Sequence, residues 1–268
     1  MRSRHRSRLR VDAAIGGMAG LASGLLGVGG GFLIVPLLTV WAGMDQHRAT
    51  GTSLAAILPI SVVAAGIYYF GGGTPQADLA IAAALVAGSV VGVIGGTFAA
   101  QRMSETALRM FVAILLLVVG VKDLHDLVFG AAAGNGGHAA GLAWEQYVLI
   151  AVCGLGIGIV AGLAGLGGGV FIVPLLVIGF GISQRVAQGT SLIAILPAAA
   201  IGAIIHEANG EVDVRAATVI AAAGVPAAIA GALLALLVPQ RILLGLFGVF
   251  LIFAAVRTWP RWPAIRRA

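Results

Sequence analysis

Three consecutive glycines, Gly29, Gly30 and Gly31, are the first residues whose type and spacing could form a ligand site. They lie inside an apolar stretch that continues through Phe32 to Pro36. Three glycines carry a large helix penalty, and proline is accommodated best in the first turn of a helix. We therefore expect one helix to end at the glycines and a second to begin near Phe32. The first backbone N–H groups of that helix have no intrahelical partner and, with the helix dipole, favour a bound anion.

The same pattern returns at Gly167, Gly168 and Gly169, with a new helix expected near Val170 and the matching proline at Pro174. Tight helix packing is the competing explanation, because glycine also lets backbones approach closely. We favour a break that faces a ligand, because both halves of the chain retain it.

Two hydroxyl-rich segments open the next apolar stretch in each half of the chain. Hydroxyl groups can donate hydrogen bonds to the oxygens of a small oxyanion without the desolvation cost of a buried cation. The alternative is that they cap the helix start or bond back to the helix. The candidate residues are Thr50, Thr52 and Ser53 in the first segment and Gln188, Thr190 and Ser191 in the second.

Four further side chains are candidates for gating or proton transfer. His47 and Arg48 precede the first hydroxyl segment, Arg185 precedes the second, and His206 ends the apolar stretch that follows it. A cation before a hydroxyl segment could attract anions toward the site, and His206 could relay protons. A solvated loop around the first three residues and a membrane edge at His206 are the competing explanations.

The elements that position these residues must lie in lipid. Sixty per cent of the residues are hydrophobic, ten per cent are charged and the mean hydropathy is +1.06, which excludes a water-soluble domain. We predict an all-α polytopic membrane protein with a lipid bilayer as its surroundings. Blocks long enough to cross the bilayer lie near 11–43, 49–70, 77–100 and 105–128, then near 144–181, 187–206, 214–238 and 241–258.

The charges predict how the chain is oriented. Nine of the sixteen basic residues lie in the two tails or, in the case of Arg257, directly beside one, a distribution typical of membrane anchors that argues against a nucleic-acid partner. By the positive-inside rule both termini are cytoplasmic, in the cell membrane of a prokaryote. The predicted units are a basic tail at 1–10, transmembrane repeat 1 at 11–128, a Gly/Ala-rich linker at 129–143, transmembrane repeat 2 at 144–258 and a basic tail at 259–268.

An internal duplication is visible when the chain is shifted by 138 residues, which places Gly24 on Gly162. After a shift of register by a few residues, Asp78 aligns with Asp213 in the comparison of the two halves. Both residues are predicted helix N-caps. Each half then has four apolar blocks, the first broken at its glycines. Block 11–43 would measure roughly 50 Å as one helix, which is too long for a comfortable single span. We therefore favour a re-entrant pair of half-helices, which makes the two repeats inverted, over a kinked continuous span, which would make them parallel. A substrate site would lie between the repeats and open to alternate sides.

The paired GxxGxGGGxxxVPxL and GTSL segments resemble those of the TauE/SafE family, over about residues 11–258. The resemblance implies a secondary transporter associated with the export of sulfite, sulfoacetate or a similar small organic anion. A secondary transporter should respond to a proton or sodium gradient, so either ion is a candidate coupling ion, and we expect no cofactor. A passive anion channel, or uptake of an organic anion such as lactate, remains the alternative, and a homodimer stays open. The apolar blocks contain no nucleophile with a base, no carboxylate pair, no metal ligand set and no nucleotide-binding loop, so we expect no enzyme and no metal site.

Overall fold

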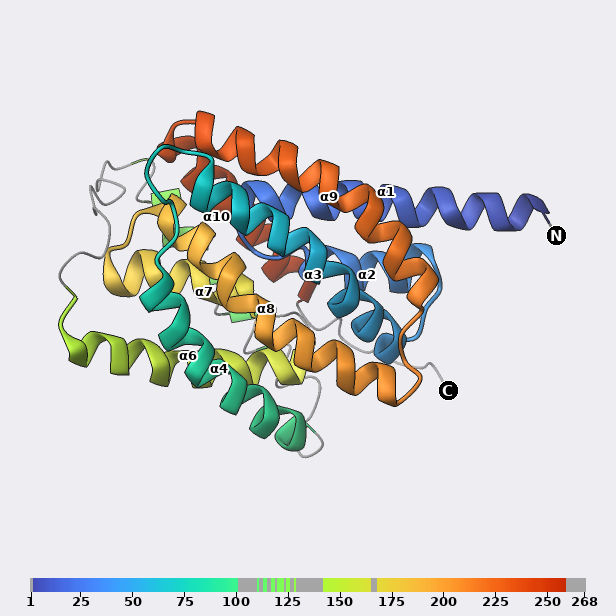
Figure 1. The fold of residues 1–268 in the computed structure, drawn as a ribbon, viewed down its shortest axis with the longest axis horizontal. Helices are drawn as coiled ribbons and strands as arrows, with labels where there is room; N and C mark the ends of the chain where they lie inside the picture. Colours follow the sequence, from blue (N-terminus) through green and yellow to red (C-terminus); the bar gives the residue numbers. More distant parts are fainter. Residues whose placement is uncertain are drawn as a thin grey trace, which may run out of the picture.

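The computed structural model describes residues 2–100, 142–164 and 168–258, together with scattered positions between 110 and 128. Within these residues the regular structure is helical throughout, which confirms the all-α prediction (Figure 1). The first half contains α1 (Arg2–Leu26), α2 (Gly31–Trp41), α3 (Gln46–Phe70) and α4 (Leu79–Ala100). The second half contains α6 (Trp144–Ala164), α7 (Gly169–Pro174), the π-helix η1 (Leu175–Gly179), α8 (Gln184–Ala208), α9 (Val214–Leu237) and α10 (Gln240–Thr258).

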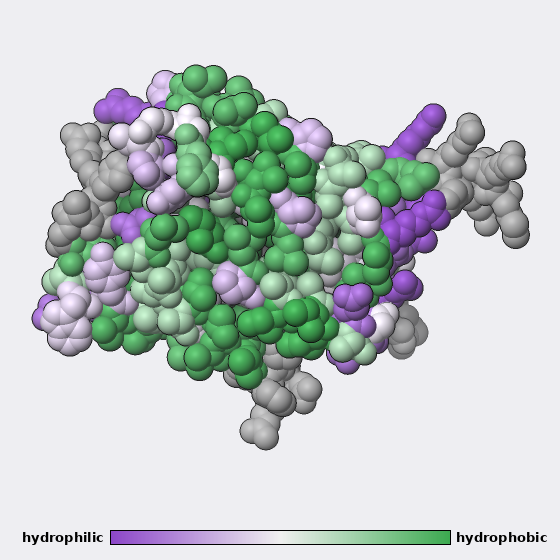
Figure 2. All heavy atoms as spheres, in the orientation of Figure 1, coloured by the Kyte–Doolittle hydropathy of each residue, from purple (hydrophilic) through white to green (hydrophobic). Residues whose placement is uncertain are grey.

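Five helices of the described chain are long and apolar enough to cross a membrane, in α1, α3, α6, α8 and α9. Large apolar side chains such as Val40, Val91 and Leu237 are exposed on the surface. Figure 2 shows hydrophobic residues over most of the visible face, with hydrophilic residues gathered toward its ends. Such a surface is suited to lipid rather than to water, so the prediction of a multi-pass membrane protein is supported.

Helices α1 and α9 pack backbone to backbone along a stripe of small residues. A Cβ added at Gly16, Gly20 or Gly24 would lie 2.1 to 2.3 Å from a carbonyl oxygen of α9. The contacts advance in the same direction along both helices, so the helices run parallel. The facing pairs are Gly16 with Ile220, Gly20 with Gly224, and Gly24 with Ala228.

Helices α4 and α6 form a second parallel pair of the same kind. A Cβ at Gly88 would lie 1.8 Å from the carbonyl oxygen of Ala151, and one at Gly92 would lie 2.1 Å from that of Leu155. These two glycine stripes therefore serve close helix packing.

Helices α3 and α8 cross the interior in opposite directions. Leu54, near the start of α3, lies beside Gly202, near the end of α8. Tyr68, near the end of α3, lies beside Gly189, near the start of α8. The two helices that carry the hydroxyl segments are therefore antiparallel.

The helix breaks lie where the glycine triplets predict them. Helix α2 begins at Gly31 and α7 at Gly169, each one residue before the predicted start. Gly30 and Gly168, the residues before them, have φ of 73° and 76°, in the left-handed region that favours glycine. The expectation for the prolines is wrong, because Pro36 and Pro174 lie in the second turn of their helices. In the second half the α-helix ends at Pro174 and continues as the π-helix η1.

Helix α2 leads the chain back toward the end from which α1 started. Arg8 of α1 and Thr52 of α3 both contact Asp213, while Gly24 and Tyr68, near the ends of the same two helices, are joined by a hydrogen bond. Helices α1 and α3 therefore run in the same direction, and the short helix between them must return. Figure 1 shows this course, with α1, α3 and α9 aligned.

Candidate functional site

The two helix breaks meet in the interior of the protein. A Cβ added at Gly169 would lie 2.7 Å from the carbonyl oxygen of Val28, which belongs to the first break. The side chain of Ile195 would lie 2.5 Å from that Cβ and 3.0 Å from one at Gly29, and Ile57 also borders Gly29. The starts of α2 and α7 therefore face a shared region between α3 and α8.

Each break presents backbone donors to this region. The N–H groups of Leu33 and Ile34 donate to the carbonyl oxygen of Gly30 at 3.0 and 3.1 Å, and that of Phe171 donates to Gly168 at 3.0 Å. The N–H groups that precede them in each helix lie before the first intrahelical bond. Neither Gly30 nor Gly168 supplies a side-chain cap. The first turns of α2 and α7 are thus arranged to receive an acceptor.

Two serines of the hydroxyl segments are buried, and one of them contacts a helix break. Ser191 is fully buried, and its hydroxyl lies 3.5 Å from the carbonyl oxygen of Gly169. Ser53, its counterpart in the first half, is also fully buried, and its hydroxyl has no hydrogen-bond partner in the described part of the chain. A buried hydroxyl without a partner costs roughly 1–3 kcal/mol, so Ser53 is a candidate ligand contact.

Gln188 lies against the first break. A Cβ at Gly27 would lie 2.5 Å from the Cα of Gln188, whose Nε2 is buried without a partner among the described residues. The hydroxyl of Tyr68 lies 3.1 Å from Gln188 Oε1 and 3.0 Å from the carbonyl oxygen of Gly24. One hydroxyl proton can serve only one of these acceptors at a time.

Tyr68 is a buried residue of this region that the sequence analysis did not select, and Ser23, whose carbonyl oxygen accepts from the N–H of Gly27, is another. In the sequence Tyr68 is only a polar side chain at the end of an apolar block. Tyrosine is common at that position because it lies at the membrane interface, so the sequence does not mark Tyr68 as a site residue.

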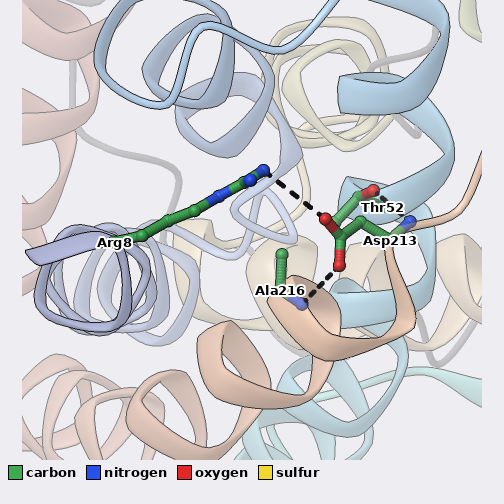
Figure 3. A network of polar contacts seen from close by, with 4 residues as sticks. All are labelled: Arg8, Thr52, Asp213 and Ala216. Carbon is green, nitrogen blue, oxygen red and sulfur yellow. Dashed lines mark hydrogen bonds and ion pairs between the residues drawn. The ribbon is translucent and has the colours of Figure 1, made fainter. Parts of the chain in front are cut away.

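The two threonines make the same contact across the halves. Thr52 Oγ1 accepts a hydrogen bond from the backbone N–H of Asp213 at 2.9 Å, and Thr190 Oγ1 accepts one from Asp78, also at 2.9 Å. Figure 3 shows the first of these bonds. The carboxylate of Asp213 accepts from the N–H of Ala216, and that of Asp78 caps α4 in the same way, which confirms both predicted N-caps.

The structure therefore brings together only part of the predicted set. Gly29 and Gly169 lie where the two breaks meet, Gly30 faces Ala19 and Gly168 faces Ile157 within their own halves, Gly31 is the first residue of α2, and Gly167 falls outside the described residues. Thr52 and Thr190 are near opposite ends of the antiparallel α3 and α8, so the two hydroxyl segments do not form a single ring.

Two other predicted residues of the set are buried. Thr50 is buried in the first turns of α3. Phe32 is buried against Phe250 of α10, with their ring centroids 5.5 Å apart.

The gating candidates lie away from the breaks. His47 and Arg48 are exposed in the first turn of α3, so they belong to a helix rather than to a loop. His206 Nδ1 lies 2.7 Å from Glu211 Oε2, and both side chains are half-buried. This pair borders the first hydroxyl segment, because a Cβ at Gly51 would lie 2.7 Å from the Cβ of His206.

Arg185 is bound to the end of another helix. Its Nε donates to the carbonyl oxygen of Ala235 at 3.2 Å, and its Nη2 donates to that of Val238 at 2.6 Å. A cation at the C-terminus of α9 stabilises the helix through its dipole and its terminal carbonyl groups.

The described residues contain no group of three or more His, Cys, Asp or Glu side chains that could hold a metal ion.

Comparison with known proteins identifies the family. The family model "Sulfite exporter TauE/SafE" matches residues 1–122 and 150–267. The chain is 24% identical over 223 residues to the probable membrane transporter protein YunE of Bacillus subtilis, covering 76% of this chain and 80% of the relative. It is 27% identical over 267 residues to a probable membrane transporter protein of Xylella fastidiosa, covering 96% and 97%.

No solved structure matches the chain. The family match covers most of the sequence, and it includes the glycine breaks and hydroxyl segments described above. The chain belongs to the TauE/SafE family of membrane transporters.

Proposed function

We propose that this protein is a secondary transporter that exports a small sulfur-containing or organic anion, such as sulfite or sulfoacetate, by alternating access between its two halves. The observation that carries the proposal is the closeness of the two helix breaks, where Gly169 lies beside the carbonyl oxygen of Val28 and shares the side chain of Ile195 with Gly29. Each helix N-terminus favours an anion by roughly 0.3–1 kcal/mol at exposed sites, and by up to about 2 kcal/mol where it is partly buried. Two such termini directed at one region support an anion site there.

The chemistry of the donors supports an oxyanion. The first turns of α2 and α7 offer backbone N–H groups, Ser191 adds a buried hydroxyl group beside Gly169, and Ser53 adds a buried hydroxyl group in the first half, so each half supplies its own donors. Neutral donors can bind an anion and release it again, whereas a buried cation would have to be desolvated when the site is empty. Gln188, with its unpartnered Nε2, is placed to contact the organic end of a sulfonate.

Alternating access requires two halves that can exchange roles. We propose that the halves form an inverted pair. Helices α3 and α8, which carry the corresponding GTSL segments of the two halves, run antiparallel, and the bond from Asp213 to Thr52 is matched by the bond from Asp78 to Thr190. In such a pair, movement of one half against the other can expose a midplane site to either side. We place both termini in the cytoplasm because of their arginines.

Equilibrium binding tests the proposed site. The purified protein should bind radiolabelled sulfite or sulfoacetate, and Ser53→Ala combined with Ser191→Ala should weaken that binding. Ser183→Ala is the matched control, because Ser183 supplies no side-chain bond to α8 and lies outside the site. Equal affinity in the double variant and the wild type, in folded protein, would remove the serines from the site.

A further inference from the structure

A small cavity lies where α1 and α9 begin, away from the meeting of the helix breaks. Its volume is about 90 Å³. It contains two carboxyl groups and two guanidinium groups, an unusual concentration of charge beside apolar transmembrane helices. The lining residues are Arg8, Leu9, Asp12, Asp213, Arg215 and Ala216.

Asp12 is the residue of this cavity that the fold leaves unsatisfied. It is 4% exposed, and its Oδ1 is buried with no hydrogen-bond partner among the described residues. Arg8 lies one helical turn earlier on α1, but its Nη2 is 3.5 Å from Asp213 Oδ2 (Figure 3). The second carboxyl group is thus occupied: Asp213 contacts Arg8, caps Ala216 and bonds to Thr52 through its backbone.

The corresponding place in the other half keeps only one of these charges, Asp78, which is the counterpart of Asp213. The repeat register puts Gln146 at the position of Arg8, Ile150 at that of Asp12 and Ala80 at that of Arg215. Ile150 is fully buried, and the bond from Asp78 to Thr190 is formed without the charged neighbours. The fold therefore accepts an apolar residue at this position, and a buried carboxyl group at Asp12 calls for another explanation.

We propose that Asp12 binds the proton that couples transport to the pH gradient, an inference that rests on the transport function proposed above. The carboxylate of Asp12 takes one proton from water that enters the cavity and returns it to water when the protein changes state. In the proposed cycle Asp12 is protonated in the arrangement described here, in which its Oδ1 has no partner among the described residues and Arg8 contacts Asp213. When the proton leaves, the carboxylate of Asp12 competes with Asp213 for Arg8, which alters the contact between α1 and α9.

The surrounding groups favour a proton over a metal cation. A sodium ion needs several oxygen ligands, whereas a proton needs a single acceptor, and two arginines line the cavity. The charged groups that face Asp12 are Arg8 on its own helix and Asp213 and Arg215 at the start of α9. Of the other helices that contact α1, α3 presents the Thr52 hydroxyl here, α2 has no titratable residue, and α10 carries its arginines in its first and last turns.

Infrared difference spectroscopy of the reconstituted full-length protein tests proton binding without reference to transport. The wild type should show the C=O stretch of a buried protonated carboxylic acid, which is lost when the pH is raised. Asp12→Asn should lack this band, and Glu145→Gln, which removes an exposed carboxylate at the start of α6, should retain it. A band that persists in Asp12→Asn would overturn the assignment.

Flux measurements supply the second readout. In proteoliposomes a pH gradient should change anion flux through the wild type and Glu145→Gln, whereas Asp12→Asn should lose that response and Asp12→Glu should recover part of it. Undiminished response in Asp12→Asn, or a response to a sodium gradient that Asp12→Asn abolishes, would contradict a proton at Asp12. If the wild type moved no anion, the proposed function would fail, and the infrared band would still decide whether Asp12 binds a proton.

Discussion

The hydroxyl group of Thr52 accepts a hydrogen bond of 2.9 Å from the backbone N–H of Asp213, 161 residues later in the chain. Thr190 and Asp78 repeat the contact at the same distance. Each hydroxyl segment therefore holds the start of a helix from the opposite half. This contact gives the threonines a structural role and leaves Ser53, whose hydroxyl has no partner among the described residues, as the hydroxyl group available to a ligand, while Ser191 donates to the carbonyl oxygen of Gly169.

Thr52→Ala should destabilise the protein by roughly 1–3 kcal/mol, because the N–H of Asp213 loses its acceptor. Thr190→Ala should do the same at Asp78. The two losses should add, because the threonines lie near opposite ends of α3 and α8 and share no partner. Thermal unfolding in detergent measures these effects, with Thr52→Ser as the variant that retains the hydroxyl. Equal destabilisation by Thr52→Ser and Thr52→Ala would show that the hydrogen bond is not the cause.

Gly30→Ala should weaken anion binding as well as stability. A residue with a Cβ in the left-handed conformation costs roughly 1–2 kcal/mol, and this Cβ would lie 2.9 Å from the carbonyl oxygen of Ala19. Gly43→Ala is the matched control, because Gly43 has φ of 65° but nothing within 4 Å of its added Cβ. Binding of labelled sulfite should fall in Gly30→Ala and remain unchanged in Gly43→Ala. A parallel loss of affinity in both variants would indicate general strain instead of an effect on the break.

The helix breaks could be predicted closely from sequence because their cause is local. Three glycines disfavour a helix at any site, and the observed starts at Gly31 and Gly169 fall within one residue of the prediction. The N-caps at Asp78 and Asp213 were predictable for the same reason.

The partners of the threonines depend on how helices from the two halves pack, which local sequence does not encode. Nothing in the residues around Thr52 indicates that its acceptor oxygen lies beside Asp213. The role of Arg185 also depends on packing, because its partners lie on α9, about 50 residues away in the chain. The burial of Asp12 is a third case, since a carboxylate near a basic tail reads as a solvated residue until α9 covers it.

Gly20→Ala and Gly17→Ala should change stability in opposite directions although both lie in α1. A Cβ at Gly20 would lie 2.1 Å from the carbonyl oxygen of Gly224, and overpacking of this kind costs roughly 1–3 kcal/mol. A Cβ at Gly17 meets nothing within 4 Å, so the higher helix propensity of alanine should stabilise the protein by roughly 0.5–1 kcal/mol. Thermal unfolding of the two variants checks the parallel packing of α1 and α9. Equal changes would contradict it.

Arg185→Gln should destabilise the protein by roughly 1.5–3 kcal/mol, because two hydrogen bonds from a charged donor to the end of α9 are lost. Arg48→Gln, at an exposed position, should stay within about 0.5 kcal/mol of the wild type. Stability and flux should be measured on the same preparations. A loss of flux in Arg185→Gln without a loss of stability would show that Arg185 gates transport instead of holding α9.

The central claim, an anion site where the starts of α2 and α7 meet, is tested most directly by counterflow in proteoliposomes. Labelled sulfite, sulfoacetate, taurine and lactate would each be offered to vesicles preloaded with the same unlabelled compound, with and without a pH gradient. We expect saturable exchange of sulfite or sulfoacetate that Gly30→Leu abolishes. Exchange that does not saturate would indicate a channel. Saturable exchange that Gly30→Leu leaves unchanged, in folded protein, would contradict the placement of the site at the helix breaks.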